Sequence, residues 1–405
     1  MSLTTTRPVT VYDHLAAGLP LRNESMQLPA QIQINGEVLI PLGDDDGNGK
    51  KKLALLNRSA EVITVEIPAS YMEAKEIRMG KSLTTYQVNN GPLFWIGEDA
   101  VRSGGDALPI GPTAQRLSDQ RHRDFGAACV VEILRKGGFS SGTYRLAVAR
   151  AIPNEEIKAK KKEDDAGGAT ETLAVKKETR TALKEHLLGK TFSVVRTDED
   201  GREEQWTITY AQVVPQAQSV GTFVAYTRDL YGRNQMGDIE AMRINDIGGG
   251  DDQIIEVIHD RGNWRMTTKP RKEGTIGLAR ALARQFPRLS LNDAQAQFAL
   301  ENRYIRNDAG RRQVIDLEIR RVMDSEGQDM VAQKLPLLQE PGFFLLFTGG
   351  GIRIPELRAM IAERAMVAGK EEETHFAFVD PTVSGVMNAF GVLMLLIFAT
   401  SGRSI

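Results

Sequence analysis

Three glycine runs, each placed directly after an apolar segment, constrain the fold of this sequence more than any other feature. The first run, Gly43–Gly49, is acidic, reads GDDDGNG and is followed by the lysines Lys50–Lys52. The second, Asn245–Asp252, reads NDIGGGDD, and the third, Phe347–Ile352, reads FTGGGI. A strand, a tight glycine turn and a second strand form a β-hairpin. The first two runs therefore predict matched hairpins in two lobes of similar build, and the ordered set of three favours a nucleotide clamp.

Glycine-rich turns suit phosphate binding because no Cβ keeps their backbone N–H groups away from phosphate oxygens. A carboxylate in such a turn repels phosphate, so its task would be to hold Mg²⁺ through water or to orient an attacking water. Asp45 and Asp246 are the candidates, and Lys50–Lys52 supplies a cation that can reach the phosphates. A single Asp/Gly turn is common in proteins, so the prediction depends on the ordered set.

Composition limits the class of protein and its partners. With 405 residues, the chain is longer than one ordinary domain, so two or three folding units are expected. Its apolar share of 41% and charged share of 26% are typical of a globular protein. The net charge of −2 gives no overall field that attracts nucleic acid. Direct nucleic-acid binding is therefore not expected, and any link to DNA would pass through an adaptor protein.

Hydropathy and cysteine content favour a cytoplasmic protein. Met1–Arg7 lacks the apolar core of a signal peptide. The longest apolar run, Ala389–Ala399, is shorter than the roughly 20 residues that a membrane span needs, so it predicts a buried C-terminal helix. The single cysteine, Cys129, cannot form an internal disulfide, and its apolar surroundings in Ala127–Leu134 indicate a buried thiol. This usage suits a reducing compartment.

The chain divides into a short extension and two domains on these patterns. We expect an extended arm over 1–35, domain I over 36–225, domain II over 226–376, and a segment over 377–405 that returns to domain I. Domain I would contain a small inserted subdomain at 58–116 and a solvated, charged loop at 154–176, because lysines and then acids follow one another there. Apolar periodicity predicts helices over 179–188, 220–230, 278–286, 291–301, 355–368 and 388–398.

The order of these features resembles the actin-like ATPases, and most closely the ParM/StbA plasmid-segregation branch. Asp45-Asp46-Gly47 followed by Lys52 resembles the family's phosphate-1 pattern, Asp246–Gly250 resembles phosphate-2, and Gly349–Gly351 resembles the adenosine motif. Shorter segments at 94–100, 289–294 and 379–389 are also similar to family segments. The resemblance covers residues 36–400 and therefore nearly the whole chain.

The resemblance implies an α/β fold: the actin-like, ribonuclease H-like duplicated two-domain ATPase, with a nucleotide cleft between the lobes. It implies ATP or ADP as ligand, with Mg²⁺ held by Asp45 and Asp246 through water. The implied nucleotide contacts are Asp46, Gly47, Asn48, Gly49, Lys52, Gly248, Gly249, Gly250, Gly349, Gly350, Gly351 and Ile352.

A role in hydrolysis is implied for the segment Val213–Gly221. In the relatives, a Glu or Gln at the start of an interdomain helix orients the hydrolytic water. Gln216 follows Pro215 as in the family pattern, whereas Gln218 fits better before the Ser-Val-Gly stretch, so both remain candidates. A glutamine cannot deprotonate water; it would position the water, with Asp246 as the charged partner.

The second turn departs from the family pattern. Asp251 and Asp252 stand where relatives usually carry Thr, and Gln253 replaces a common Asp. The extra negative charge would lie close to phosphate, where it could shift metal affinity or slow hydrolysis.

Three functions fit a clamp of this kind. The first is an ATP-hydrolysing, actin-like protein that polymerises into dynamic filaments and moves plasmid or other DNA through an adaptor. The alternative is a nucleotide-binding assembly or scaffold protein of the pilus or division type, with little hydrolysis. A sugar or acetate kinase ranks last, because the sequence shows no signature of a substrate site between the lobes.

Overall fold

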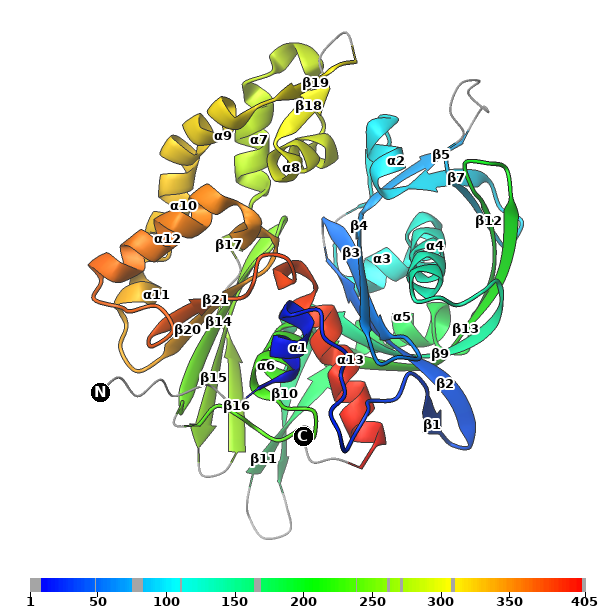
Figure 1. Cartoon of the computed structure of the whole chain (residues 1–405), viewed down its shortest axis with the longest axis horizontal. Coiled ribbons are helices and arrows are strands. Elements are labelled where there is room, and N and C mark those ends of the chain that lie inside the picture. Colours follow the sequence, from blue (N-terminus) through cyan, green and yellow to red (C-terminus); the bar gives the residue numbers. More distant parts are fainter. Residues whose placement is uncertain are drawn as a thin grey trace.

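The chain forms two lobes, each built on a β-sheet with helices packed against it (Figure 1). The computed structural model describes residues 9–47, 49–74, 83–109, 111–163, 169–237, 239–260, 263–269, 272–306 and 310–402. Lobe I carries an 11-stranded sheet and lobe II a six-stranded sheet. The mixed α/β character and the two lobes agree with the predicted fold class.

The sheet of lobe I curls around the helix α4, Gln120–Lys136 (Figure 1). Its strands are β1 (Ile32–Ile34), β2 (Glu37–Asp46), β3 (Lys50–Leu56), β4 (Val62–Pro68), β5 (Ser70–Glu73), β6 (Thr85–Val88), β7 (Leu93–Ile96), β8 (Asp106–Ala107), β9 (Gly142–Ile152), β12 (Thr191–Thr197) and β13 (Glu203–Ala217). The strand order is β4-β3-β2-β9-β13-β12-β6-β7-β5-β8, and β1 pairs with β2. The further helices of this lobe are α2 (Gly97–Arg102), α3 (Thr113–Ser118) and α5 (Lys177–His186).

Lobe II repeats the central arrangement of lobe I. Its sheet has the order β16-β15-β14-β20-β21, with β17 paired to β15. The strands are β14 (Ala241–Ile247), β15 (Asp251–Asp260), β16 (Asn263–Thr268), β17 (Lys272–Glu273), β20 (Phe344–Thr348) and β21 (Phe376–Phe378). In both lobes an antiparallel hairpin, β2–β3 or β14–β15, lies beside a parallel strand, β9 or β20. The prediction of matched hairpins is confirmed.

The remaining elements of lobe II are mostly helices around this sheet. They are α7 (Ile276–Arg284), η2 (Pro287–Leu289), α8 (Asp293–Asn302), α9 (Asp316–Val322), η3 (Met323–Gly327), α10 (Gln328–Ala332), α11 (Leu335–Gln339), η4 (Gly350–Arg353) and α12 (Pro355–Val367), with the hairpin β18 (Tyr304–Arg306) and β19 (Arg312–Val314). Asn292 caps α8 by accepting from the backbone N–H of Gln295.

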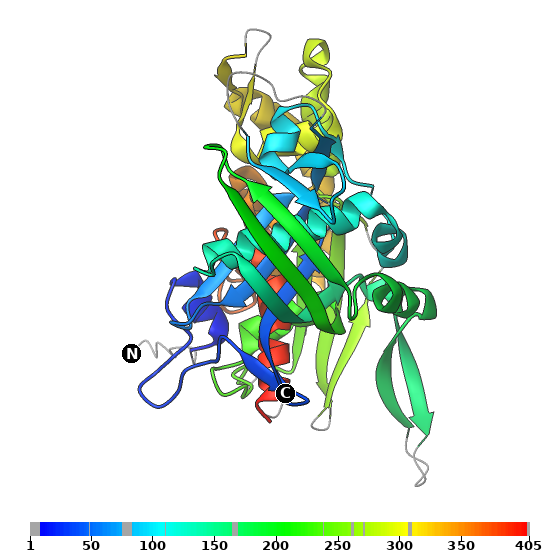
Figure 2. The ribbon, with the colours of Figure 1, turned by 90° about the vertical axis from the view of Figure 1, so that its right-hand side faces the viewer.

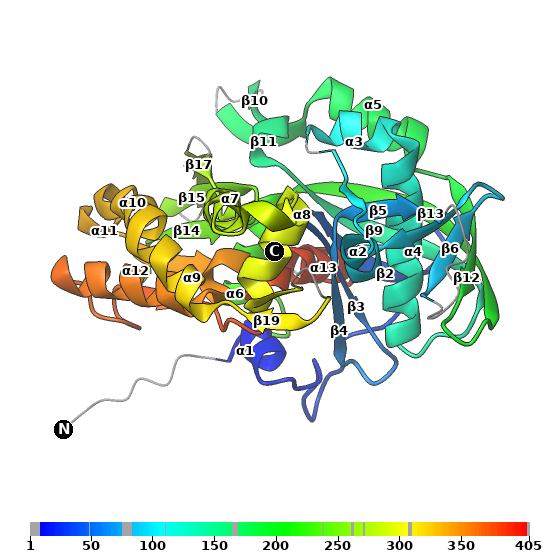
Figure 3. The same ribbon diagram turned by 90° about the horizontal axis from the view of Figure 1, so that it is seen from above.

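Two helices, α6 (Gln218–Thr227) and α13 (Met387–Thr400), pack together between the lobes, and η5 (Ser384–Val386) precedes α13 (Figure 3). Their backbones touch: a Cβ at Gly391 would lie 1.7 Å from the carbonyl oxygen of Gly221. A Cβ at Gly43 of β2 would lie 1.9 Å from the carbonyl oxygen of Ala389. Residues Met387–Phe398 are all buried, which confirms the prediction of a buried C-terminal helix. Among the residues described, no helix is long and apolar enough to cross a bilayer.

Two expectations for the irregular segments change. The expected extended arm forms the short helix α1 (Val11–Ala16) from residue 11 and then follows the surface of lobe I, with Leu21 and Leu28 fully buried. The expected charged loop at 154–176 begins with η1 (Asn154–Glu156) and continues as the hairpin β10 (Ile157–Glu163) and β11 (Ala169–Val175). This hairpin projects away from the body of the molecule (Figure 2).

Candidate functional site

The turns of both hairpins border one cleft between the lobes. The cleft has a volume of about 610 Å³ and is lined by Gly49 and Lys50 from the first turn and by Gly249 and Gly250 from the second. Its other walls come from β4, from α8 and from the segment Arg353–Pro355. The structure thus brings together two turns that lie far apart in the sequence.

The third glycine run packs directly on the end of β14. Gly349 has φ = +91°, and a Cβ there would lie 2.3 Å from Oδ1 of Asp246. A Cβ at Gly351 would lie 2.4 Å from the Ile247 side chain. Gly350, Gly351 and the fully buried Ile352 belong to η4. Only glycine permits this approach, so the second and third runs form one compact unit.

The aspartates of β2 point to opposite faces of the strand, because side chains alternate along a strand. Asp44 and Asp46 form ion pairs with both Lys51 and Arg150, and these four side chains are largely buried. Although burial opposes it, the cations of Lys51 and Arg150 hold the pKa of Asp46 far below its usual range. Asp46 therefore stabilises the hairpin through ion pairs on the face of β2 opposite Asp45.

Asp45 lies on the other face of β2, toward the start of α6, and is 1% exposed. Its Oδ1 accepts a hydrogen bond from Nε2 of Gln218 at 3.1 Å, and its Oδ2 lies 3.4 Å from Nζ of Lys52. Burial raises the pKa of Asp45. Burial alone would lower the pKa of Lys52, but the carboxylates of Asp45 and Asp246 raise it, so Lys52 stays charged between the two acids.

Asp246, the penultimate residue of β14, contributes to the same cluster from lobe II. Its Oδ2 accepts a hydrogen bond from Nδ2 of Asn388 at 2.7 Å. Burial raises the pKa of Asp246 to about 6; the Lys52 ammonium opposes this shift, and the neighbouring Asp45 carboxylate adds to it. Two buried carboxylates and one ammonium thus converge from the two hairpins.

Of the two glutamine candidates, Gln218 contacts Asp45. It is the first residue of α6 and is 9% exposed. Gln216 lies in β13, opposite Ala151 of β9, and is only partly buried. Asn48 lies outside the described residues, whereas Gly47 directly follows β2.

The backbone of the second turn is held by the chain before α7. The carbonyl oxygen of Gly248 accepts from the N–H of Thr275 at 3.0 Å, and that of Gly249 accepts from Ile276 at 2.7 Å. The N–H of Gly248 donates to the carbonyl oxygen of Asp251 at 2.8 Å. These bonds fix the shape of the turn at the cleft.

The extra acids of the second turn have partners within the protein. The carboxylate of Asp252 pairs with the ammonium of Lys334, and both side chains are 2% exposed. Asp252 also accepts a hydrogen bond from Asn245. Asp251 accepts from Nε2 of Gln253 at 2.8 Å. The expected free negative charge of Asp252 is thus neutralised by a lysine that carries no signal in the sequence.

Two ion pairs across the cleft were also not predicted from the sequence. Lys50 of β3 pairs with Glu301 of α8, and Glu66 of β4 pairs with Arg353, whose Nη1 lies 2.8 Å from Oε2 of Glu66. All four residues line the cleft. They join the two lobes across the cleft.

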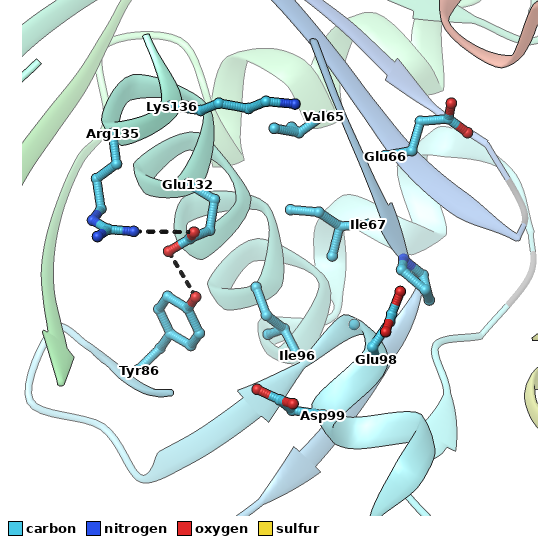
Figure 4. Close-up of a pocket in the computed structure, with 12 residues that line it drawn as sticks. Val65, Glu66, Ile67, Tyr86, Ile96, Glu98, Asp99, Glu132, Arg135 and Lys136 are labelled. Carbon is cyan, nitrogen blue, oxygen red and sulfur yellow. Dashed lines mark hydrogen bonds and ion pairs between the residues drawn. The ribbon is translucent and has the colours of Figure 1, made fainter. Parts of the chain in front are cut away.

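A second hollow of about 650 Å³ lies within lobe I, between β4, α2 and α4 (Figure 4). Glu132 of α4 accepts a hydrogen bond from the Tyr86 hydroxyl at 2.8 Å and lies 3.4 Å from Nη1 of Arg135. None of the predicted site residues lines this hollow. The interlobe cleft is therefore the candidate site.

Comparison with known proteins gives likeness in structure only. No family model matches the sequence, and no curated protein matches it significantly. ParM of Bacillus thuringiensis with ATP is similar at a TM-score of 0.59 and 13% identity, with 90% of this chain and 99% of that chain covered. An archaeal actin homologue, Ta0583, in complex with ADP gives a TM-score of 0.58 and 15% identity, with the same coverage. Apo psk41 ParM gives 0.55 and 14%, covering 89% of this chain and 98% of its own.

The likeness extends along both lobes, and it agrees with the repeated hairpin-and-parallel-strand units and with the cleft between them. The chain therefore has the two-lobed fold of the actin-like ATPases.

Proposed function

We propose that the interlobe cleft binds ATP or ADP with Mg²⁺ and that the protein hydrolyses ATP. The observation that carries this proposal is the convergence of Asp45, Lys52 and Asp246 from the same two hairpins whose glycine turns line the interlobe cleft. The similar solved structures include ParM with ATP and the archaeal homologue with ADP, which supports a nucleotide as the ligand.

The residues would divide between phosphate and nucleoside. The backbone N–H groups of Gly47, Gly49, Gly249 and Gly250 would bind the phosphates, with Lys52 as the cation. The N–H of Gly248, also expected to contact the nucleotide, instead donates to the carbonyl oxygen of Asp251. Gly349–Gly351 and Ile352 would form the floor beneath the nucleoside. The walls formed by α8 and Arg353–Pro355 leave room for the base and sugar.

Asp45 and Asp246 fit a magnesium ion. Among the described residues no three His, Cys, Asp or Glu side chains form a complete metal site. Mg²⁺ in nucleotide enzymes usually keeps several waters and takes only one or two carboxylates besides the phosphates, so two acids are enough. Burial raises the pKa of both acids because it disfavours their ionised forms. A bound cation would stabilise the ionised carboxylates and so offset this effect. When bound, the ion would neutralise charge on the phosphates.

Hydrolysis would use Gln218 to position the attacking water. The water oxygen forms a bond to the γ-phosphorus, the bond from that phosphorus to the bridging oxygen breaks, and ADP and phosphate leave. A glutamine cannot take the proton, so it orients the water and the proton passes to the phosphate or to solvent.

The paired substitutions Gln218→Ala and Gln216→Ala test this assignment. We expect Gln218→Ala to lower the rate of phosphate release about 100-fold, the size of effect seen when one positioned polar group is removed. Gln216→Ala should stay within about twofold, because Gln216 lies outside the Asp45 cluster. Equal rates for the two variants would remove Gln218 from the mechanism.

We further propose that the protein polymerises into dynamic filaments in the cytoplasm and segregates plasmid or other DNA through an adaptor protein. Closure of two lobes on a nucleotide changes the surfaces at opposite ends of a molecule, and a head-to-tail contact that does not close into a ring gives a filament. The ParM likeness supports this proposal, and the net charge of −2 supports an adaptor. Light scattering with ATP, with ADP and without nucleotide tests it; scattering independent of ATP would overturn ATP-driven assembly.

The alternative of a scaffold with little hydrolysis loses its main support. The departure of Asp251 and Asp252 from the family pattern fits that alternative, but both acids have partners within the protein, Lys334 for Asp252 and Gln253 for Asp251. We therefore propose active hydrolysis.

A further inference from the structure

Three side-chain amides form a continuous hydrogen-bonded chain that ends on Asp45. Nδ2 of Asn154 donates to Oε1 of Gln253 at 3.2 Å. Nε2 of Gln253 donates to Oε1 of Gln218 at 3.0 Å, and Nε2 of Gln218 donates to Oδ1 of Asp45 at 3.1 Å. Every member is at most 9% exposed. The chain therefore lies out of reach of bulk water.

The chain has one direction. Each glutamine accepts at its oxygen and donates from its nitrogen, and the final acceptor is a carboxylate that can only accept while it is ionised. If one amide turned over, two NH₂ groups or two oxygens would face each other in a buried site, at the cost of unpaired polar groups. The orientation of Gln218 is thus set at both ends, by Asp45 and by Gln253.

Asn154 sets the direction at the start of the chain. Its Nδ2 also donates to Oγ of Ser219 at 2.9 Å, which fixes the side chain against the first turn of α6. Its buried Oδ1 has no hydrogen-bond partner among the described residues. Asn154 therefore acts in this cluster as a hydrogen-bond donor. Its Nδ2 needs an acceptor, so the Gln253 side chain must face it with Oε1.

The chain also crosses between the lobes. Asn154 lies in η1, after β9 of lobe I, whereas Gln253 lies in β15 of lobe II. Gln218 begins α6, between the lobes, and Asp45 belongs to β2 of lobe I. The orientation of Gln218 consequently depends on the position of lobe II.

We propose that Asn154 is a positioning residue for ATP hydrolysis, acting on Gln218 through Gln253. This inference rests on the proposed function of Gln218. An amide oxygen has two lone pairs, so Oε1 of Gln218 accepts from Gln253 and keeps one lone pair for a hydrogen of the attacking water. Nε2 of Gln253 also donates to Asp251 at 2.8 Å, so without Asn154 the Gln253 side chain keeps its NH₂ direction but loses the donor that holds its oxygen. Gln218 would then keep its bond to Asp45, but its oxygen would no longer be held in one position for the water.

The test uses the full-length protein with Mg·ATP and the variants Asn154→Asp and Asn154→Ala. Asn154→Asp keeps the shape of the side chain but cannot donate to Gln253. We expect the single-turnover rate of hydrolysis to fall about tenfold in both variants, since misplacement of a catalytic group is expensive. Binding of a fluorescent ATP analogue should stay within about twofold, because Asn154 is not among the residues that line the cleft.

The same substitutions in a Gln218→Ala background separate positioning from a general structural role. If Asn154 acts through Gln218, Asn154→Ala should have no further effect on the rate there. An equal loss in both backgrounds overturns the proposal.

A readout without catalysis comes from NMR of protein labelled with ¹⁵N at glutamine. The Gln218 and Gln253 side-chain amide signals are assigned from the Gln218→Ala and Gln253→Ala variants. Asn154→Asp should shift both signals, and unchanged signals overturn the proposal. If the wild-type protein hydrolyses ATP and Asn154→Ala hydrolyses it at the same rate, only the positioning role of Asn154 is overturned. A wild-type protein that does not hydrolyse ATP overturns the proposed function and this inference together.

Discussion

Asp246 is a buried acid at the junction of the lobes, and its burial raises its pKa. Its pKa rises from 3.8 to about 6, a shift equivalent to about 3 kcal/mol. A raised carboxyl pKa means that the folded state holds its proton more tightly than the unfolded chain. Its contribution to stability is therefore fully present below pH 3.8 and is lost as the pH rises through 6.

Asp246→Asn removes this titration and keeps an oxygen that can accept from Asn388. Without nucleotide, we expect the variant to gain stability over the wild type as the pH rises, by about 1 kcal/mol between pH 5 and pH 8. Urea unfolding at the two pH values measures the gain. A constant difference between the two proteins would contradict it. The same variant should lose phosphate release, since it lacks the acid proposed to hold the metal.

Lys334 and Asp252 form a buried pair that must be kept or removed as a unit. Lys334→Met leaves the Asp252 charge buried, with Asn245 as its remaining neighbour, and we expect a loss of about 3–5 kcal/mol in unfolding free energy. Adding Asp252→Asn should recover part of the loss. Lys272→Met, at an exposed lysine of β17, is the control and should change stability by less than about 0.5 kcal/mol. Urea unfolding compares the three; equal effects at both lysines would disprove the role of the pair.

At the scale of elements, the sequence predicts regular structure well where the periodic signal is long. The hairpins β2–β3 and β14–β15 and the helices α5, α6, α8, α12 and α13 lie where they were expected. The helix α1 was missed because its six residues carry less than two turns of periodicity, although the capping pair Thr10 and Asp13 stands in the sequence. The hairpin β10–β11 was missed because consecutive charges hide the alternation of a strand.

The N-terminal segment is part of the fold of lobe I. The N–H of Leu21 donates to the carbonyl oxygen of Ala60 at 2.8 Å, and its side chain is fully buried. Leu21→Ala should cost about 2–5 kcal/mol in unfolding free energy, the usual range for a buried leucine. Leu19→Ala, at a leucine that is 54% exposed, is the matched control and should have little effect. Thermal unfolding compares the two; equal melting temperatures would show that the segment does not contribute to the core.

For the whole molecule, the predicted glycine motifs identified the turns that border the cleft. They did not identify the residues of β4, α8 and Arg353–Pro355 that form its other walls. Glycine and aspartate have fixed roles in tight turns, so their positions could be inferred from local sequence. The cross-lobe pair of Glu66 and Arg353 joins residues that are 287 positions apart, and Gln253 meets Asn154 across 99 positions. Nothing in the local sequence marks such partners, because their proximity is a property of how the lobes pack.

The cross-lobe ion pairs should hold the cleft closed without nucleotide. Arg353→Glu places a second carboxylate beside Glu66, so we expect small-angle X-ray scattering to report a larger radius of gyration. The reversed pair, Glu66→Arg with Arg353→Glu, should restore the wild-type value. The effect is worth about 1 kcal/mol, because both side chains are partly exposed, and high salt should weaken it. An unchanged radius in the single variant would show that other contacts set the closure.

The contact between Gly221 of α6 and Gly391 of α13 is a candidate rotation axis for movement between the lobes. Two helix backbones touch there without an intervening side chain, so no rotamer change can absorb a displacement between α6 and α13. Sliding along this contact would drive main-chain atoms into one another, whereas turning about it keeps them at the same distance. We therefore expect the lobes to swing about a single fixed line. A change of nucleotide would then change the angle between the lobes. The displacement of a surface residue would grow in proportion to its distance from the rotation axis.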